Sequence, residues 1–461
     1  MFRKFVTCMR LQIILHSLGN VLCRALPRTP PNFSFEKSLD QKNFIKFFSF
    51  REGLLFFKFF EVQKLFFKKV SGGGWGNAPK NRVPKECKMI CKRIQVTNFR
   101  NIASADVEFC EGVNLLCGDN AQGKTNLLEA IYFTALGKSF RPAKEAELIR
   151  FGEEGARLTN EFHDSLRDQT LSVTLFGGQR RRVVEQNGVK IGKMSDVVGA
   201  FRVVLFCPEH LSIVQGGPEL RRAYLNVALS QLRPVYLHAL QRYNHILKER
   251  NSLIRHAQDD MNTFRATMPI WSAQLAHEAA ILAAHRDRYV RQANESVRAC
   301  FADMTGGSEL PELSYVNSLG LTGEALSDRE AVEAKYLDLL TTRYDREIGA
   351  GTTLYGIHKD DIQIHLNGHP ARLYASQGQQ RSLSLAMKLA EGSISAAESG
   401  GDMPVFLFDD VLSELDIHRR TYLMHELRGR QVILTATDAE DANIVGGVRV
   451  IRVRNGKFEN E

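Results

Sequence analysis

The 461-residue sequence lacks cysteines at metal-binding or redox spacing. Its eight cysteines stand at positions 8, 23, 87, 91, 110, 117, 207 and 300, and no two of them form a Cys-x-x-Cys pair. Cys87 and Cys91 are a lone pair four residues apart, with no histidine near them. This spacing excludes zinc fingers and thioredoxin-like redox motifs. We therefore expect free thiols in a cytoplasmic protein.

Long apolar runs and a basic excess in the main body are also missing. No apolar run reaches the eighteen or so residues of a membrane span, since Lys46, Lys58 and Lys64 interrupt the most apolar stretch. The net charge of +9 arises in residues 1–88, which hold 17 Lys and Arg against 5 Asp and Glu. Residues 89–461 hold 44 against 47, a net charge of −3. We expect no membrane partner, and only a local basic patch could bind a polyanion.

Residues 1–88 also contain 14 of the 28 phenylalanines. Three interpretations stay open: an amphipathic Phe/Lys segment on a membrane surface, a targeting peptide, and an upstream stretch joined to the protein by a misplaced start. We favour the third, which makes Met89 the first residue of the working fold. From Met89 the sequence alternates as a first β-strand does, MICKRIQVTNFRNIASADVEF.

Residues 118–125, GDNAQGKT, have the spacing of a P-loop. Its glycines let backbone amides turn toward phosphates, Lys124 would reach the β- and γ-phosphate oxygens, and the Thr125 hydroxyl would bind Mg²⁺. The expected nucleotide-binding residues are those of the whole loop: Gly118, Asp119, Asn120, Ala121, Gln122, Gly123, Lys124 and Thr125.

The context of the octet supports a P-loop over a Gly-rich turn without function. An apolar, strand-like stretch at 113–116 precedes it, and a helix-like stretch, NLLEAIYFTALG, follows at 126–137. Strand, glycine loop and helix is the setting that phosphate binding requires. Gly137 is the expected end of the helix.

A second candidate element lies at 404–416, PVFLFDDVLSELD. The apolar run 405–408 predicts a buried parallel strand that ends in Asp409 and Asp410. Acids at the carboxyl end of such a strand lie where ligands bind in open α/β sheets. The alternative is a pair of acids at a helix start, with SELD as a cap.

A third stretch, SQGQQRSLSLAMKLAE at 376–391, predicts a helix that begins after Ser376 and Gly378. Taken alone, it favours a capping turn. A helix start also presents free amides and a positive dipole end, which suit a phosphate.

These three stretches together resemble the Walker A, signature, Walker B and D-loop series of the ABC-type ATPases, in the branch that contains the SMC proteins. Within that branch the sequence is similar to the RecF family of bacterial recombination mediators over 89–461. The stretches that carry the resemblance are NFRNI at 98–102, GDNAQGKTNLLEAIYFTALGKSFR from 118, GGPELRRAYLN at 216–226, YGIHKDD at 355–361 and SQGQQRS at 376–382.

The resemblance implies an α/β fold with a P-loop ABC-type ATPase head, a mixed sheet flanked by helices, and an inserted helical lobe. It also implies that two heads dimerise on ATP, with Ser376 and Gly378 of one copy on the γ-phosphate held by the other. Asp409 with Thr125 would bind Mg²⁺. Lys124 and Asp410 are the expected catalytic residues, with Asp410 in the place of a water-positioning glutamate.

The sequence departs from the RecF family pattern at Lys359, and it differs from the wider ABC class at Asp410 and at the switch histidine. Asp410 is one methylene shorter than glutamate, so we expect slow ATP turnover that acts as a switch. Lys359 replaces the arginine of a GPHRDD stretch and loses its planar fork. A switch histidine is missing from ILTATDAED at 433–441, where Thr437 or Asp438 could take its place.

The expected domains are an N-terminal part of the head at 89–207, a mainly helical insertion at 208–350, and a C-terminal part of the head at 351–461. Heptad-like spacing predicts two helices in the insertion, with DDMNTF near the turn between them and Gly306 and Gly307 at its end. We expect these helices to run only a few turns each, which argues against a coiled-coil arm.

The candidates for DNA binding are Arg180, Arg181 and Arg182 on a predicted hairpin, with Arg221 and Arg222 further on. Contacts to phosphates would make binding sequence-tolerant and salt-sensitive. The family resemblance implies a nucleoid-associated, ATP-gated clamp on single-stranded and gapped duplex DNA, with a weak DNA-stimulated ATPase, and RecR and RecO as partners. An SMC-like chromosome-organising ATPase and an ATP-binding subunit of a transporter are the alternatives.

Overall fold

The computed structural model describes residues 89–178, 182–437 and 448–460. The interpretations of residues 1–88 fall outside this range. Within it, no helix has both the length and the hydropathy that a membrane crossing requires.

The first large sheet is antiparallel and begins at Ile90, in the stretch whose alternation predicts a first strand. Its strand order is β2-β1-β4-β5-β6-β7. The strands are β1 (Ile90–Phe99), β2 (Ile102–Glu108), β4 (Gly155–His163), β5 (Asp168–Phe176), β6 (Val183–Gln186) and β7 (Val189–Ile191). Side chains alternate between buried and exposed along β1 and β4, so one face of this sheet packs in the interior.

The second large sheet is parallel except at one edge, and its order is β15-β14-β3-β13-β12-β8. Its strands are β3 (Val113–Cys117), β8 (Val203–Phe206), β12 (Val405–Phe408), β13 (Val432–Ala436), β14 (Arg449–Arg454) and β15 (Lys457–Asn460). Strands β8, β12 and β13 are buried throughout, as expected for parallel strands covered on both faces. The strand predicted at 405–408 is confirmed.

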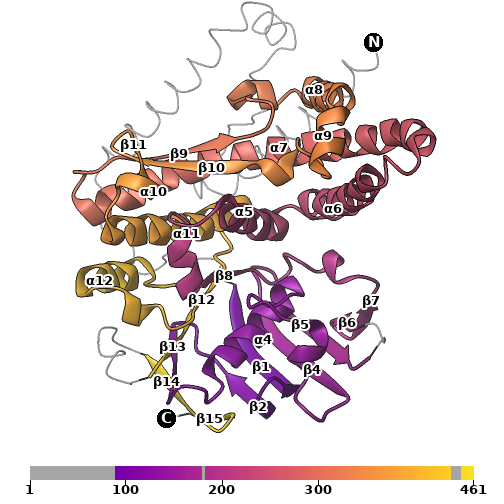
Figure 1. Cartoon of the computed structure of the whole chain (residues 1–461). Coiled ribbons are helices and arrows are strands. Elements are labelled where there is room, and N and C mark those ends of the chain that lie inside the picture. Colours follow the sequence, from indigo (N-terminus) through magenta and orange to yellow (C-terminus); the bar gives the residue numbers. More distant parts are fainter. Residues whose placement is uncertain (1–88, 179–181, 438–447, 461) are drawn as a thin grey trace, which may run out of the picture. The chain divides into compact units, whose positions relative to one another are not determined.

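Helices cover the parallel sheet on both faces. Helix α4 (Lys124–Leu136) contacts strands of both large sheets, and nearly all of its residues are buried. On the other face, residues of α11 (Gln377–Glu398) and α12 (Ile417–Glu426) share a core with the sheet. Figure 1 shows α4 among the strands and α12 beside β12 and β13. Gly137 ends α4 in a left-handed conformation, as predicted.

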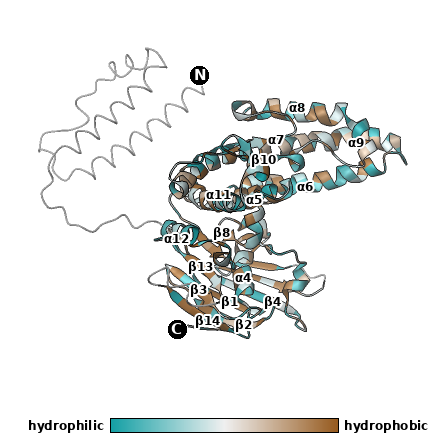
Figure 2. Cartoon of the chain, turned by 60° about the vertical axis from the view of Figure 1, so that its left-hand side comes forward, coloured by the Kyte–Doolittle hydropathy of each residue, from teal (hydrophilic) through white to brown (hydrophobic). Residues whose placement is uncertain are grey.

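The insertion between β8 and the C-terminal strands is mainly helical. Its helices are α5 (Pro218–Leu232), α6 (Pro234–Arg255), α7 (Met261–Thr305), α8 (Arg329–Thr342), α9 (Tyr344–Ala350) and α10 (Ala371–Tyr374). They pack with a small antiparallel sheet of order β11-β10-β9. Its strands are β9 (Pro311–Val316), β10 (Asp361–Leu366) and β11 (His369–Pro370). Figure 2 shows that hydrophobic and hydrophilic residues alternate along these helices.

The expectation of helices with only a few turns is wrong for α7, which has 45 residues. Buried residues recur from Phe264 to Phe301, because the helix packs in turn against α6, α8, β9 and α11. Because α7 has packing partners along its whole length, the helix continues without interruption. The long helix is therefore part of a packed lobe, and the predicted turn before it is confirmed at 256–260.

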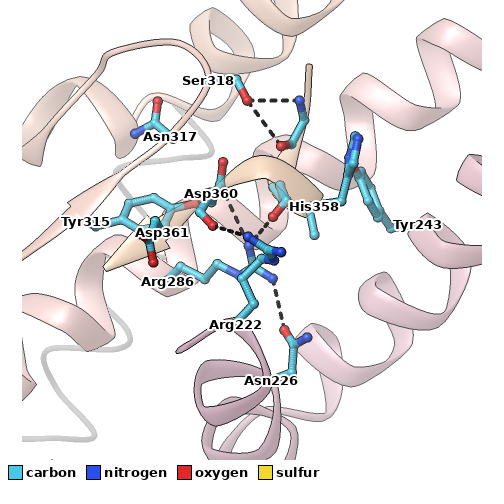
Figure 3. A network of polar contacts seen from close by, with 12 residues as sticks. Arg222, Asn226, Tyr243, Arg286, Tyr315, Asn317, Ser318, His358, Asp360 and Asp361 are labelled. Atoms are coloured by element: carbon cyan, nitrogen blue, oxygen red, sulfur yellow. Dashed lines mark hydrogen bonds and ion pairs between the residues drawn. The ribbon is translucent and has the colours of Figure 1, made fainter. Parts of the chain in front are cut away.

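The stretch YGIHKDD at 355–361 forms the polar centre of this lobe (Figure 3). The buried Arg286 of α7 donates to the Ile357 carbonyl at 2.6 Å and pairs with Asp360 at 3.2 Å. Tyr315 of β9 also donates to Asp360. On the other side, the Tyr243 hydroxyl lies 2.7 Å from Nδ1 of His358. The motif thus joins α6, α7 and β9.

The interpretation of Arg221 as a DNA contact is wrong. Its guanidinium is buried and donates to both oxygens of Asp361, at 2.6 and 2.8 Å. Arg222 donates to the Asp360 carbonyl at 2.9 Å. A paired, buried guanidinium cannot reach a DNA phosphate, so the Arg221–Asp361 pair fixes α5 to β10 instead.

Two groups in this network respond to pH in opposite directions. Burial lowers the pKa of His358 to about 4, against an ordinary value of 6.5. Its contribution to stability is therefore present above pH 6.5 and is lost as the pH falls toward 4. Burial raises the pKa of Asp360 to about 6, although Arg286 and Tyr315 oppose this. The contribution of Asp360 to stability is therefore present below pH 3.8, the ordinary pKa of aspartate, and is lost as the pH rises through 6.

Replacing His358 should flatten the acid side of the stability profile. In His358→Gln the side-chain amide can still accept from Tyr243, but it has no proton to gain between pH 6.5 and pH 4. We expect the free energy of unfolding of the variant to fall less over this interval than that of the wild type. Urea unfolding at a series of pH values measures the difference, and parallel profiles would show that His358 does not titrate as the structure indicates.

Candidate functional site

The loop between β3 and α4 has a backbone that requires glycine at two positions. A Cβ atom on Gly118 would lie 2.3 Å from the Val453 carbonyl oxygen. Gly123 has φ 114, a conformation that other residues rarely adopt, and precedes the first residue of α4. Ala121 has φ 65 and is held in this unfavourable region. The loop therefore has the conformation of a phosphate cradle as well as its sequence.

Lys124 lies within this loop and is 8% exposed. Its Nζ donates to the carbonyls of Gly118 and Asp119, the latter at 2.9 Å. The loop borders a cavity of about 450 Å³. The residues that line it are Asn101, Asn120, Ala121, Gln122, Gly123, Lys124, Thr125, Asn126, Arg141, Asp410 and Thr435.

The two predicted acids meet the P-loop at the carboxyl end of β12. The Thr125 hydroxyl donates to Asp409 at 2.8 Å, and Thr435 of β13 donates to the same oxygen at 3.2 Å. Thr435 also accepts from the backbone N–H of Asp410 at 2.8 Å. Asp410 is exposed, borders the cavity and has φ 51, which Asp tolerates better than most residues.

The two carboxylates differ in environment. Burial raises the pKa of Asp409, while the hydrogen bonds from Thr125 and Thr435 lower it, and the net shift is upward. A divalent cation beside Asp409 would favour the charged form. Thr125 and Asp409 together offer hydroxyl and carboxylate oxygens, the hard donors that Mg²⁺ takes from proteins.

Ser376 and Gly378 lie at the start of α11 and are not among the residues that line the cavity. The Ser376 side chain accepts from the backbone N–H of Gln379 at 3.2 Å, and the Gln379 side chain accepts from the N–H of Ser376 at 2.7 Å. This capping box is the local interpretation that the sequence favoured. The SELD stretch at 413–416, which corresponds to the D-loop, contacts the first turns of α11, since Arg381 donates to the Glu414 carbonyl at 2.6 Å.

Three further residues, Asn101, Asn126 and Arg141, support the P-loop, and no role was assigned to them from the sequence. Asn101 donates to the Ala121 carbonyl at 3.1 Å and accepts from Asn126 at 2.6 Å. Arg141 donates to Asn126 and borders the cavity. The NFRNI and GKSFR runs, which flank the P-loop unit, could have pointed to Asn101 and Arg141, and Asn126 directly follows Thr125.

Glu129 of α4 organises the arginines beside this loop. Its side chain is fully buried and accepts from Arg100 at 2.7 Å, and from Arg141 and Ser139. Burial raises the pKa of Glu129, but these hydrogen bonds outweigh it, so that the net shift is downward. A buried carboxylate with two guanidinium partners stays ionised and fixes Arg141 at the cavity.

Of the other candidates, the described residues Arg182 and Thr437 do not line the cavity. Arg180, Arg181 and Asp438 are outside the described residues, while Thr437 is exposed at the end of β13. Arg182 donates to the Gly137 carbonyl at 2.5 Å and pairs with Glu145 at 3.2 Å. These contacts hold Arg182 against the end of α4, and its DNA-binding role stays a prediction.

A second cavity, of about 830 Å³, adjoins the first, because Asn101 and Asn126 line both. It is bordered on its other side by the segment 146–153. The P-loop cavity therefore continues into a space large enough for the rest of a nucleotide.

Comparison with known proteins agrees with this geometry. The family described as RecF/RecN/SMC N terminal domain matches residues 90–457. A protein of Staphylococcus epidermidis named DNA replication and repair protein RecF is 36% identical over 368 residues, which are 79% of this chain and 98% of the relative. The protein of the same name from Clostridium perfringens is 34% identical over 373 residues, 80% of this chain and 100% of the relative.

Two solved structures described as the recombination mediator protein RecF in the RecFOR pathway, one with ATP and one with ATPrS, share the fold. Each superposes with a TM-score of 0.76, at 32% and 33% identity, and covers 83% and 81% of this chain. The predicted P-loop ABC-type head is confirmed. With its P-loop, helical insertion and paired acids in this order, the chain belongs to the RecF family of DNA replication and repair proteins.

Proposed function

We propose that this protein binds ATP at the P-loop and uses it to close a head-to-head dimer on DNA. The Thr125–Asp409 hydrogen bond is the single observation that carries the proposal, since it brings a Walker A hydroxyl and a Walker B carboxylate together. A structure of a 32% identical RecF with ATP supports it. The triphosphate would lie in the 450 Å³ cavity and the nucleoside in the cavity that adjoins it.

Four residues at or beside the cavity have distinct tasks in this proposal. Lys124 exchanges its loop carbonyls for β- and γ-phosphate oxygens, and the backbone amides of the loop bind the remaining oxygens. Thr125 and Asp409 hold Mg²⁺, which neutralises phosphate charge when it is bound. Asp410 orients the attacking water.

The γ-phosphate needs donors that one copy does not offer at its own cavity. Ser376 and Gly378 do not line it, although they stand at a helix start, whose positive dipole end suits a phosphate. A second copy, turned by a two-fold axis, supplies them in the proposed dimer. ATP is then bound between the two heads and holds them together. Slow hydrolysis, which DNA stimulates weakly, lets the dimer open.

The biological task we propose is that of a recombination mediator in the cytoplasm, on the nucleoid. The closed dimer binds single-stranded and gapped duplex DNA without sequence preference and helps to load a recombinase, with RecR and RecO as partners. The SMC-like alternative predicts a projecting coiled coil. In this chain α7 packs against α6, α8, β9 and α11, as part of a compact lobe, which favours the clamp.

Asp410→Asn should slow hydrolysis without weakening ATP binding. Asparagine tolerates φ 51 as aspartate does, so the backbone is kept while the carboxylate is lost. We expect turnover to fall by about a hundredfold, the usual contribution of a positioned base. Steady-state turnover and titration with a fluorescent ATP analogue measure the two effects. Unchanged turnover would remove Asp410 from the chemistry.

Mixing two slow variants should restore hydrolysis if the site is shared between copies. Asp410→Asn damages the P-loop side and Ser376→Ala the opposing side, so a mixed dimer keeps one of its two sites intact. A 1:1 mixture should reach about a quarter of the wild-type rate, because half of randomly formed dimers are mixed.

Each variant alone is the control for this experiment. A mixture no faster than its components would contradict the shared site. A Ser376→Ala protein that works at the wild-type rate on its own would do so too.

Arg180→Glu combined with Arg181→Glu should weaken DNA binding and leave ATP binding unchanged. Loss of two phosphate contacts should reduce the slope of log K against log salt by about two. Fluorescence anisotropy with a gapped duplex at several salt concentrations measures this slope. The matched control is Arg329→Glu with Lys335→Glu on α8, which makes the same change in net charge at two exposed positions. Equal effects of both pairs would refute a specific contact.

A further inference from the structure

The C-terminal hairpin of β14 and β15 reaches the P-loop. Strand β14 pairs in parallel with β3, with Arg452 opposite Cys117, the last residue before the loop. Parallel strands end at the same edge of a sheet, so the turn after β14 arrives beside Gly118. This turn consists of Asn455 and Gly456, with φ 51 and 72, the geometry of a two-residue hairpin.

Both residues of the turn donate a hydrogen bond to Gln122 in the middle of the P-loop. The N–H of Asn455 donates to Oε1 of Gln122 at 2.5 Å, and the N–H of Gly456 donates to the Gln122 carbonyl at 2.9 Å. The hairpin also passes close to the start of the loop, at Gly118. The contact is thus specific to the phosphate cradle.

These hydrogen bonds fix the direction of amides in the cradle. The carbonyl of Ala121 is held by Asn101 and that of Gln122 by Gly456. In a trans peptide the carbonyl and the following N–H point in opposite directions. Holding the two carbonyls therefore points the N–H groups of Gln122 and Gly123 away from Asn101 and the hairpin. Fixed amides cost no reordering when a phosphate binds.

We propose that Gln122, Asn455 and Gly456 are positioning residues for phosphate binding, so that the last strands of the chain set the affinity for the nucleotide. This inference rests on the proposed ATP site and adds the C-terminal hairpin to it. Asn455 and Gly456 act through the backbone of the loop and do not line the cavity, and the Gln122 side chain links them to that backbone.

The chain provides matched controls, because it contains three Asn-Gly hairpin turns of similar geometry. Asn187–Gly188 joins β6 to β7, and Asn367–Gly368 joins β10 to β11, with glycine φ of 79 in each. A Cβ atom at Gly188 or Gly368 would meet no atom within 4 Å. At Gly456 it would lie 3.2 Å from the Asn101 carbonyl oxygen. A glycine-to-alanine change thus strains all three turns alike, but displaces only one from the P-loop.

The test compares Gly456→Ala with Gly188→Ala and Gly368→Ala in the full chain. We expect Gly456→Ala to bind a fluorescent ATP analogue about tenfold more weakly, the loss expected when hydrogen bonds to a charged group are misaligned. KM for ATP should rise in parallel, with kcat at saturation unchanged. The two control variants should bind as the wild type does, although their thermal midpoints fall by a similar amount.

A second variant keeps the test decisive if Gly456→Ala does not fold. Gln122→Met has a side chain of similar length without an acceptor for Asn455, and it should also raise KM and leave kcat unchanged. Wild-type affinity in both variants, or an equal loss in the Gly188 and Gly368 controls, overturns the inference. Failure of the wild type to bind ATP overturns the proposed function instead.

Discussion

The hydrogen bond between Thr125 and Asp409 is the contact on which the site depends, and it joins residues 284 positions apart. Thr125 stands at the start of α4 and Asp409 follows β12, while Thr435 of β13 donates to the same oxygen. These residues meet only when β3, β13 and β12 are neighbours in one parallel sheet. The site therefore forms only if the chain, after the helical insertion, comes back to the parallel sheet and places β12 beside β8.

Helix α11 carries this constraint into the insertion. Leu385 and Leu389 pack in the core of the parallel sheet, while Leu383, Met387 and Ile394 pack in the core of the helical lobe. Because one helix serves both cores, the lobe cannot move against the sheet without moving or distorting α11. The start of that helix carries Ser376, so the lobe and the proposed contact with a second copy are mechanically linked.

Charge inside the head is balanced locally. The buried Glu129 is ionised with Arg100 and Arg141 as partners, since leaving either a buried carboxylate or a guanidinium unpaired is costly. In the lobe, Asp360 with Arg286 and Asp361 with Arg221 follow the same rule. Arg221, which the sequence offers as a candidate for DNA binding, is therefore structural, because the sequence shows its charge but not its partner.

The sequence by itself determined the local elements: the P-loop between a strand and a helix, the buried strand before Asp409 and Asp410, and the capped start of α11 at Ser376. Each of these elements depends on residues that are near one another in the sequence, so the spacing and periodicity of the residues reveal it. Only the tertiary structure decided the length of α7, the burial of Arg221, the position of Thr435 and Arg141 at the cavity, and the contact of Asn455 and Gly456 with Gln122. These features arise from pairs far apart in the chain, and the pattern of one segment carries no information about which distant segment will cover it.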